Sequence, residues 1–161
     1  RMGNEGRVIA CDIYDHKLRL IEKAARRLGI SILETQKNDG SIFNESFFEI
    51  ADKVIVDAPC SGLGVVRRKP EIKYKEYSME MERLPKKQLA ILSASSSYVK
   101  PGGTLLYSTC TVNPEENEEV VEAFLRKNPS FEKKEKLLLL PQVDGTDGFF
   151  ICVMKRSESL I

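Results

Sequence analysis

Two of the four cysteines stand where a thiol could carry out chemistry. Cys60 lies in the segment DAPCSG and Cys110 in the segment YSTCT, and each segment directly follows a short apolar run. A thiol at the end of a strand, beside small or polar residues, can be exposed at a pocket and activated as a nucleophile. Cys11 and Cys152 stand inside apolar runs instead, and we predict that both are buried and unreactive.

Three aspartates occupy the same kind of position, because Asp12, Asp39 and Asp57 each come just after a predicted strand. In an open parallel sheet, ligands bind at the carboxyl ends of the strands, and an acid after the second strand accepts hydrogen bonds from a ribose. A single aspartate at such a place is more often a turn former or a helix cap. Three of them at corresponding strand ends favour a site for a nucleotide-like cofactor.

Positive charge is concentrated between Arg67 and Lys87. The whole chain has a net charge of +1, which gives no long-range attraction for a polyanion, so contact with a nucleic acid would need a local patch. A solvated charged face explains the same composition and is favoured on composition alone. The segment has four acids against eight basic residues, which are Arg67, Arg68, Lys69, Lys73, Lys75, Arg83, Lys86 and Lys87.

The candidate cysteines and aspartates can meet only if the strands before them end at one edge of a sheet. The pattern of apolar residues predicts such strands. Short apolar runs predict four strands, at 8–11, 30–35, 53–56 and 104–107. Helical periodicity predicts helices at 16–28, with Leu18, Ile21, Ala25 and Leu28 buried, and at about 81–99. Strands that alternate with helices predict an α/β fold, in which helices cover both faces of a mostly parallel sheet.

The carboxyl-terminal third predicts one more helix and a closing pair of strands. The segment NPEE from Asn113 has a capping side chain, a proline at the first helical position and a glutamate at the third, which is a strong signal for a helix start. A strand at 148–154 is expected to pair with part of 131–140. That pair would give the sheet an antiparallel edge. Before this region, the segment KPGG at 100–103 predicts a turn.

Composition limits the class of protein. The 161 residues suit a single domain, and 42% hydrophobic with 30% charged residues is typical of soluble globular proteins. No apolar run approaches the roughly 20 residues that span a bilayer, and no signal peptide is recognisable at the start. The cysteines form no C-x-x-C pair, so we expect a cytoplasmic domain with no membrane contact, metal site or disulfide framework.

Two long segments resemble signature motifs of a known enzyme family. VDAPCSGLGVVRRKPEIK at 56–73 and YSTCTVNPEENE at 107–118 are similar to motifs of the Nol/Nop/Sun RNA 5-methylcytosine methyltransferases. The similarity extends over 3–155, includes DGTDGFF at 144–150, and is greatest to the bacterial Sun (Fmu) branch, which methylates 16S ribosomal RNA. The resemblance implies a Rossmann-like class I methyltransferase fold, S-adenosylmethionine as cofactor and ribosomal RNA as partner.

The resemblance also implies a role for each candidate residue. The 5-position of cytosine is a weak nucleophile, so a thiolate first adds to the 6-position and creates an enamine that can accept a methyl group. Cys110 corresponds to that nucleophile, Cys60 to the thiol that assists product release, and Asp57 to a contact with the base. Asp12 and Asp39 correspond to contacts with the cofactor's ribose and adenine, and Asp57 also borders the cofactor.

The basic segment gains a purpose from the same resemblance. An enzyme that acts on a base must hold the flanking phosphates while the target base is extruded into the pocket. The resemblance therefore favours RNA contact by Arg67, Arg68 and Lys69 over a merely solvated face.

The chain also departs from the family pattern. The family's glycine-rich cofactor loop and the strand before it would precede Gly3, as would the RNA-recognition region of the Sun branch. We therefore expect residues 1–161 to be a partial, carboxyl-terminal methyltransferase domain that is inactive by itself. The family's strand order, 3-2-1-4-5 plus the tail strands, would lose its central member, and the exposed edges would favour pairing with another chain.

Two other functions are compatible with parts of the sequence. One is a noncatalytic RNA-binding or ribosome-assembly module, which would bind RNA without any response to the cofactor. The other is a DNA-type cytosine methyltransferase, because Pro59-Cys60 is the dipeptide that holds the nucleophile in that family. The segment around Cys110 argues against the DNA-type enzyme, which needs no second cysteine there.

Overall fold

The computed structural model describes residues 2–74 and 79–158, which form two sheets. The smaller sheet pairs β1 (Val8–Asp12) with β2 (Leu33–Lys37) in parallel, and α1 (Asp15–Arg27) connects the two strands. The larger sheet has the order β3-β4-β6-β5. The α/β class is therefore as predicted.

The larger sheet combines a parallel pair with an antiparallel edge. Its strands are β3 (Ala51–Asp57), β4 (Val99–Thr109), β5 (Phe131–Leu139) and β6 (Phe149–Arg156). Strand β3 runs parallel to β4, whereas β6 is antiparallel to both β4 and β5. The predicted closing pair of strands is thus confirmed.

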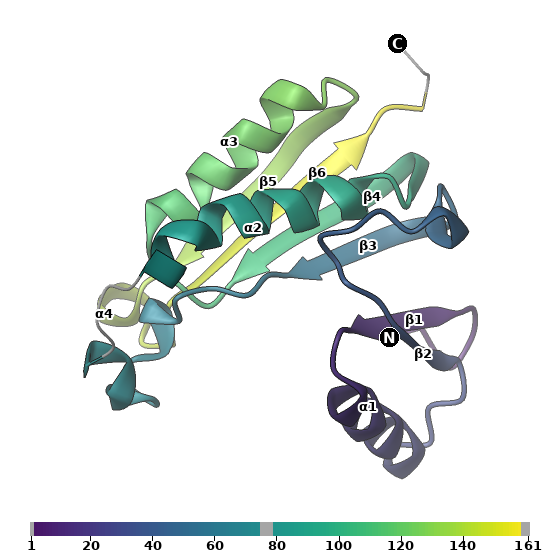
Figure 1. Ribbon diagram of the computed structural model, residues 1–161, viewed down its shortest axis with the longest axis horizontal. Coiled ribbons are helices and arrows are strands. Elements are labelled where there is room, and N and C mark those ends of the chain that lie inside the picture. Colours follow the sequence, from purple (N-terminus) through teal and green to yellow (C-terminus); the bar gives the residue numbers. More distant parts are fainter. Residues whose placement is uncertain (1, 75–78, 159–161) are drawn as a thin grey trace.

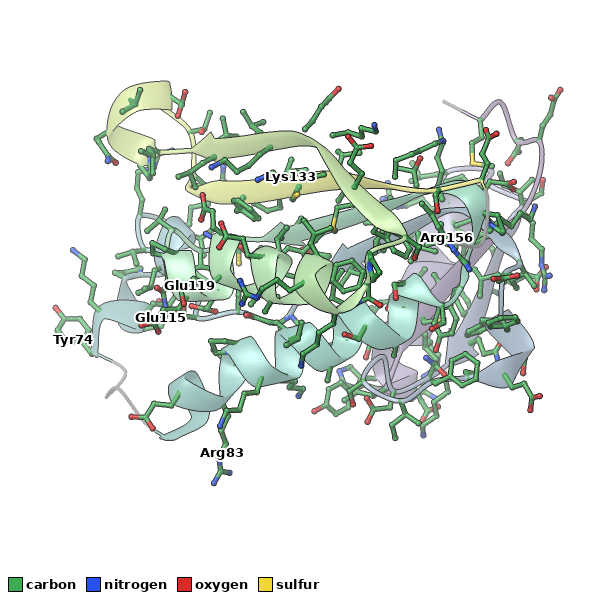
Figure 2. The ribbon with its side chains drawn as sticks, turned by 90° about the horizontal axis from the view of Figure 1, so that it is seen from above. Tyr74, Arg83, Glu115, Glu119, Lys133 and Arg156 are labelled. Carbon is green, nitrogen blue, oxygen red and sulfur yellow. The ribbon has the colours of Figure 1, made fainter. Side chains whose placement is uncertain are left out.

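Helices α2 (Met79–Ser96) and α3 (Glu118–Lys127) lie side by side on one face of the larger sheet (Figures 1 and 2). The core between them and the sheet contains the fully buried Leu105, Tyr107, Phe124 and Phe150. Alternate positions of the strands face the other side, where Ile55 is 72% exposed. This alternation follows from the two-residue period of a strand.

The smaller unit shows where sequence patterns hold and where they fail. Helix α1 begins and ends within one residue of the predicted bounds, and Gly29 adopts the left-handed conformation (φ 66°) that terminates it. Leu18 and Ala25 are buried as predicted, but Leu28 is 60% exposed because it stands at the helix end, where the chain turns. The prediction that Cys11 is buried is also wrong: it lies exposed on β1, whereas Cys152 is buried.

Strand β4 is longer than its sequence indicates. Val99 pairs with Ala51 and Thr104 with Lys53, so residues 100–103 loop out of the ladder between these two pairs. Gly102 has a φ of 72°, a conformation that L side chains rarely adopt. The predicted turn is therefore a bulge within a strand that begins earlier than expected.

Several short helical turns connect these elements. They are η1 (Glu45–Phe47), η2 (Leu63–Val65), η3 (Pro70–Tyr74), η4 (Pro114–Glu116) and the short helix α4 (Pro141–Asp144). Among the described residues, no strand of the smaller sheet pairs with a strand of the larger sheet. None of the helices over 2–74 and 79–158 is long and apolar enough to cross a membrane.

Candidate active site

The two candidate cysteines meet beyond the carboxyl ends of β3 and β4. Asp57 pairs with Ser108 at the end of the parallel ladder, and the Ala58 amide donates to the Ser108 carbonyl at 2.9 Å. Because neighbouring parallel strands end at the same edge, the loops that follow them emerge side by side. The Sγ atoms of Cys60 and Cys110 consequently lie 3.1 Å apart, and both residues are half-buried.

A close backbone approach at Gly64 joins the three segments on which the family resemblance rests. The Gly64 amide donates to the Cys110 carbonyl at 3.0 Å, and the Gly148 amide donates to the Gly64 carbonyl at 2.8 Å. A Cβ atom on Gly64 would overlap the Gly148 carbonyl. Glycine is therefore required for the cysteine loops to pack against the start of β6.

A buried carboxylate lies beneath the Cys60 loop. Glu116 is only 2% exposed and accepts hydrogen bonds from the Ser61 amide at 2.8 Å and from the Ser61 hydroxyl at 2.5 Å. The side-chain amide of Gln88 donates both to Glu116 at 3.0 Å and to the Pro59 carbonyl at 2.9 Å. The residues on either side of Cys60 are therefore held by one network.

The next residue, Asn117, holds the Cys110 loop in the same way. Its side chain accepts from the Thr109 hydroxyl at 2.5 Å and donates to the Thr111 carbonyl at 3.0 Å. The sequence predicts Glu116 only as the third residue of a helix. The sequence signal for its role is its place in the motif that contains Cys110. The predicted helix start is a 3-10 turn, η4, which Asn117 separates from α3.

Burial affects the ionisation of two residues at this site. Burial raises the pKa of Cys60 to about 12, and its contact with Cys110 contributes in the same direction. Cys60 therefore remains a neutral thiol around neutral pH. Burial likewise raises the pKa of Tyr107, whose hydroxyl donates to the Glu116 carbonyl at 2.6 Å.

The three candidate aspartates lie after three different strands. Asp57 is exposed at the end of β3 and accepts from the Ser108 hydroxyl at 3.3 Å. Asp12 accepts from the Tyr14 amide at 2.9 Å and lies 3.5 Å from the Lys17 ammonium. Both acids thus occupy the strand-end positions that the sequence predicts.

Asp39 is exposed in the loop after β2. Its carboxylate accepts from the Ser41 hydroxyl at 2.6 Å and from the Ser41 amide at 2.9 Å. These hydrogen bonds lower the pKa of Asp39, and the charge of Lys87 lowers it further. Lys87 precedes Gln88, the residue that contacts the Cys60 loop. Helix α2 therefore borders both the Asp39 loop and the cysteine site.

The three predicted RNA contacts are exposed between η2 and η3, but two of them have a common partner. The guanidinium groups of Arg67 and Arg68 lie 3.6 Å and 2.6 Å from the carboxylate of Asp147, which is 19% exposed. Lys69 is also exposed. Both arginine side chains are themselves mostly exposed, so a phosphate can reach their guanidinium groups from the solvent.

The rest of the basic segment is more dispersed. Arg83 projects into solvent from α2 (Figure 2), and Lys86 and Lys87 are exposed on the same helix. Lys75 lies outside the described residues. Over 2–74 and 79–158, no group of three or more His, Cys, Asp or Glu residues is placed to hold a metal ion.

Comparisons with known proteins identify relatives over nearly the whole chain. The family model described as 16S rRNA methyltransferase RsmB/F matches residues 1–155. The probable ribosomal RNA small subunit methyltransferase B of Bacillus subtilis is 42% identical over 173 residues, which cover 96% of this chain and 39% of that protein. The ribosomal RNA small subunit methyltransferase F of Escherichia coli is 31% identical, covering 99% of this chain and 37% of that protein.

A solved structure is similar over the same region. The crystal structure of NSun6 from Pyrococcus horikoshii with SFG has a TM-score of 0.83 and 28% sequence identity, and it covers 97% of this chain and 43% of that one. The chain spans about two fifths of the length of the curated relatives described above.

Proposed function

The chain belongs to the 16S rRNA methyltransferase RsmB/F family, and on that premise we propose that it carries the catalytic centre for methylation of the 5-position of cytosine in RNA. The proposed substrate is ribosomal RNA, the proposed cofactor is S-adenosylmethionine, and the reaction passes through a covalent cysteine adduct. Residues 1–161 form part of the methyltransferase domain. The 3.1 Å approach of Cys60 and Cys110 is the observation that carries this proposal.

Two thiols in contact suit a reaction that needs attack and release at the same ring. Cys110 adds to the 6-position of cytosine, which makes the 5-position electron-rich enough to accept a methyl group. The assignment of attack to Cys110 and of release to Cys60 follows the family resemblance, and the contact between the two thiols allows both to act on one bound base. After methyl transfer, a base takes the 5-position proton, the C–H electrons re-form the 5,6 double bond, and Cys110 leaves as a thiolate in a release that Cys60 assists.

Asp57 is the proposed contact with the target base. Its exposed carboxylate stands three residues before Cys60, at the edge where the two thiols meet. Carboxylates accept hydrogen bonds from the exocyclic amino group of cytosine. A negative charge there also stabilises the protonated base, which favours addition of the thiol.

The remaining acids fit a nucleoside-containing cofactor. Asp12 and Asp39 follow the adjacent parallel strands β1 and β2, the kind of strand end at which ribose and base are bound in such sheets. Besides local backbone amides, the partners of Asp12 and Asp39 are an exposed lysine and a serine, and hydroxyl groups of a ligand could replace these two side chains. When bound, S-adenosylmethionine supplies an electrophilic methyl group.

Arg67, Arg68 and Lys69 complete the proposal as phosphate contacts. They follow the Cys60 loop after the short turn η2, so we expect a strand of RNA whose base enters the site to pass near them. Phosphate contacts of this kind position the nucleic acid without reading its sequence.

The test is the identity of the modified nucleoside. The complete protein is incubated with S-adenosylmethionine and unmodified 30S subunits or 16S ribosomal RNA, and the digested RNA is analysed by mass spectrometry. We expect 5-methylcytidine, and we expect none with Cys110→Ala. Methylation at another atom, or RNA binding without methyl transfer, would overturn the proposal, and the second result would favour the noncatalytic module.

A further inference from the structure

Glu116 and Asn117 are adjacent in the chain but contact different cysteine loops. Glu116 accepts two hydrogen bonds from Ser61, and Asn117 makes two with Thr109 and Thr111. Ser61 follows Cys60, whereas the two threonines flank Cys110. Each cysteine loop therefore has a contacting side chain of its own at the junction of η4 and α3.

The backbone at Asn117 makes this division possible. Its φ of −110° and ψ of −96° interrupt the helical path between η4 and α3. The Tyr107 hydroxyl donates to the Glu116 carbonyl at 2.6 Å and thereby ties this interruption to β4. The two side chains consequently reach two loops instead of continuing around one helix surface.

The contacts of Glu116 suit a side chain that accepts hydrogen bonds at both of its oxygens. The Ser61 amide, the Ser61 hydroxyl and the Gln88 side-chain amide all point donors at its two oxygens. A carboxylate accepts at both oxygens, whereas a glutamine in its place would turn an N–H group toward one of these donors. Glu116→Gln is nearly isosteric and therefore disturbs the Cys60 loop with little change in volume.

The two networks also contact each other through Thr111. The Thr111 hydroxyl is 3.5 Å from a Glu116 oxygen, at the limit of a hydrogen bond, and lies 2.8 Å from the Ser61 hydroxyl. Within the part of the chain that the structure describes, the Asn117 side chain makes no hydrogen bond to the Cys60 loop. Each of the two side chains therefore acts mainly on the loop that it contacts, and the Ser61–Thr111 contact transmits part of any disturbance to the other loop.

We infer that Glu116 and Asn117 are separate positioning residues, Glu116 for Cys60 and Asn117 for Cys110. The inference rests on the proposed function, in which Cys110 attacks the ring and Cys60 assists release. Loss of Glu116 displaces the thiol needed for release while leaving attack possible. Loss of Asn117 displaces the attacking thiol itself, so the two variants fail at different steps.

The experiment compares Glu116→Gln and Asn117→Ala in the complete protein with ribosomal RNA. For Glu116→Gln, methyl transfer in the first turnover stays within about 3-fold of wild type. Its kcat falls by about 10-fold to 100-fold, the scale of an ångström-sized misplacement, and methylated RNA accumulates in a denaturation-resistant adduct. For Asn117→Ala, first-turnover methyl transfer falls by a similar factor and no adduct accumulates. KM changes little in either variant.

Matched controls separate positioning from folding. Glu115→Gln removes an exposed carboxylate next to Glu116 and is expected to behave as wild type. Ser61→Ala keeps the amide donor but removes the hydroxyl, so it should accumulate the same adduct as Glu116→Gln in a smaller amount. This variant tests the inference even if Glu116→Gln folds poorly. Circular dichroism melting reports the fold of each variant.

The results separate this inference from the proposed function. If the wild type produces no 5-methylcytidine, both fail. If the wild type is active but Glu116→Gln slows the first turnover as much as it slows kcat, the positioning inference alone is wrong. It is also wrong if both variants accumulate the same amount of adduct.

Discussion

The Sγ atoms of Cys60 and Cys110 lie 3.1 Å apart, although 50 residues separate them in the chain. This contact arises because β3 and β4 are parallel neighbours that end in register at Asp57 and Ser108. Two thiols at this distance can act in turn on one atom of a substrate, and they can also react with each other. Both kinds of behaviour can be measured.

Replacement of each cysteine by alanine should have opposite effects. Cys110→Ala removes the attacking atom, so neither methylation nor a covalent adduct should form, although RNA can still bind. Cys60→Ala leaves attack and methyl transfer possible but hinders elimination, so enzyme joined to methylated RNA should accumulate as a denaturation-resistant band on a gel. The reverse pattern would make Cys60 the nucleophile and favour the DNA-type assignment.

The same pair should form a disulfide in the absence of RNA. A small-molecule disulfide such as oxidised glutathione would first form a mixed disulfide with one thiol. The second thiol would then displace reduced glutathione, so that the protein loses two hydrogen atoms and the reagent gains them. Peptide mapping should find the Cys60–Cys110 bond. Oxidation should also abolish activity, and dithiothreitol should restore it.

The rate of this oxidation should rise with pH through the neutral range, because the thiolate is the reacting form. Cys11→Ser is the matched control, since Cys11 is exposed but lies on β1. It should leave the rate of disulfide formation unchanged. A bond that forms only between Cys11 residues of two molecules would contradict the geometry.

Charge reversal of Arg67 and Arg68 should weaken RNA binding and reduce its dependence on salt. Removal of one phosphate contact lowers the slope of log K against log salt by about one unit. Filter binding over a range of salt concentrations measures this slope. An unchanged slope would mean that these arginines only pair with Asp147.

Asp147→Asn tests the same arginines from the opposite direction. The Asp147 carboxylate lies near both guanidinium groups, so its neutralisation should free them and strengthen RNA binding at low salt. Weaker binding in this variant would mean that the ion pairs orient the arginines for RNA.

Gly64→Ala should disrupt the site through the backbone. The new Cβ would overlap the Gly148 carbonyl and crowd the Cys110 carbonyl, so we expect a loss of about 1–3 kcal/mol in the free energy of unfolding, as for other overpacked positions. Gly40→Ala is the control, because its Cβ would meet only the Ile91 side chain at an ordinary distance of 3.4 Å. Chemical denaturation of both variants gives the comparison.

Much of this protein could be predicted from local sequence. The bounds of α1, the turn at Gly29 and the closing pair of strands depend on the spacing of apolar residues and on single turn residues, which act over a few positions. The motifs around Cys60 and Cys110 likewise placed both thiols after strands. What local sequence could not give is the distance between them, which depends on the pairing and register of two strands far apart in the chain.

The tertiary structure alone decided the surroundings of these residues. Cys11 looks buried in an apolar run, yet it is exposed on the two-stranded sheet. Glu116 looks like an exposed residue of a helix start, yet it is buried against Ser61. Burial and hydrogen-bond partners are set by segments that pack together from distant parts of the chain, whereas residue types and periodicity describe only what each segment can offer.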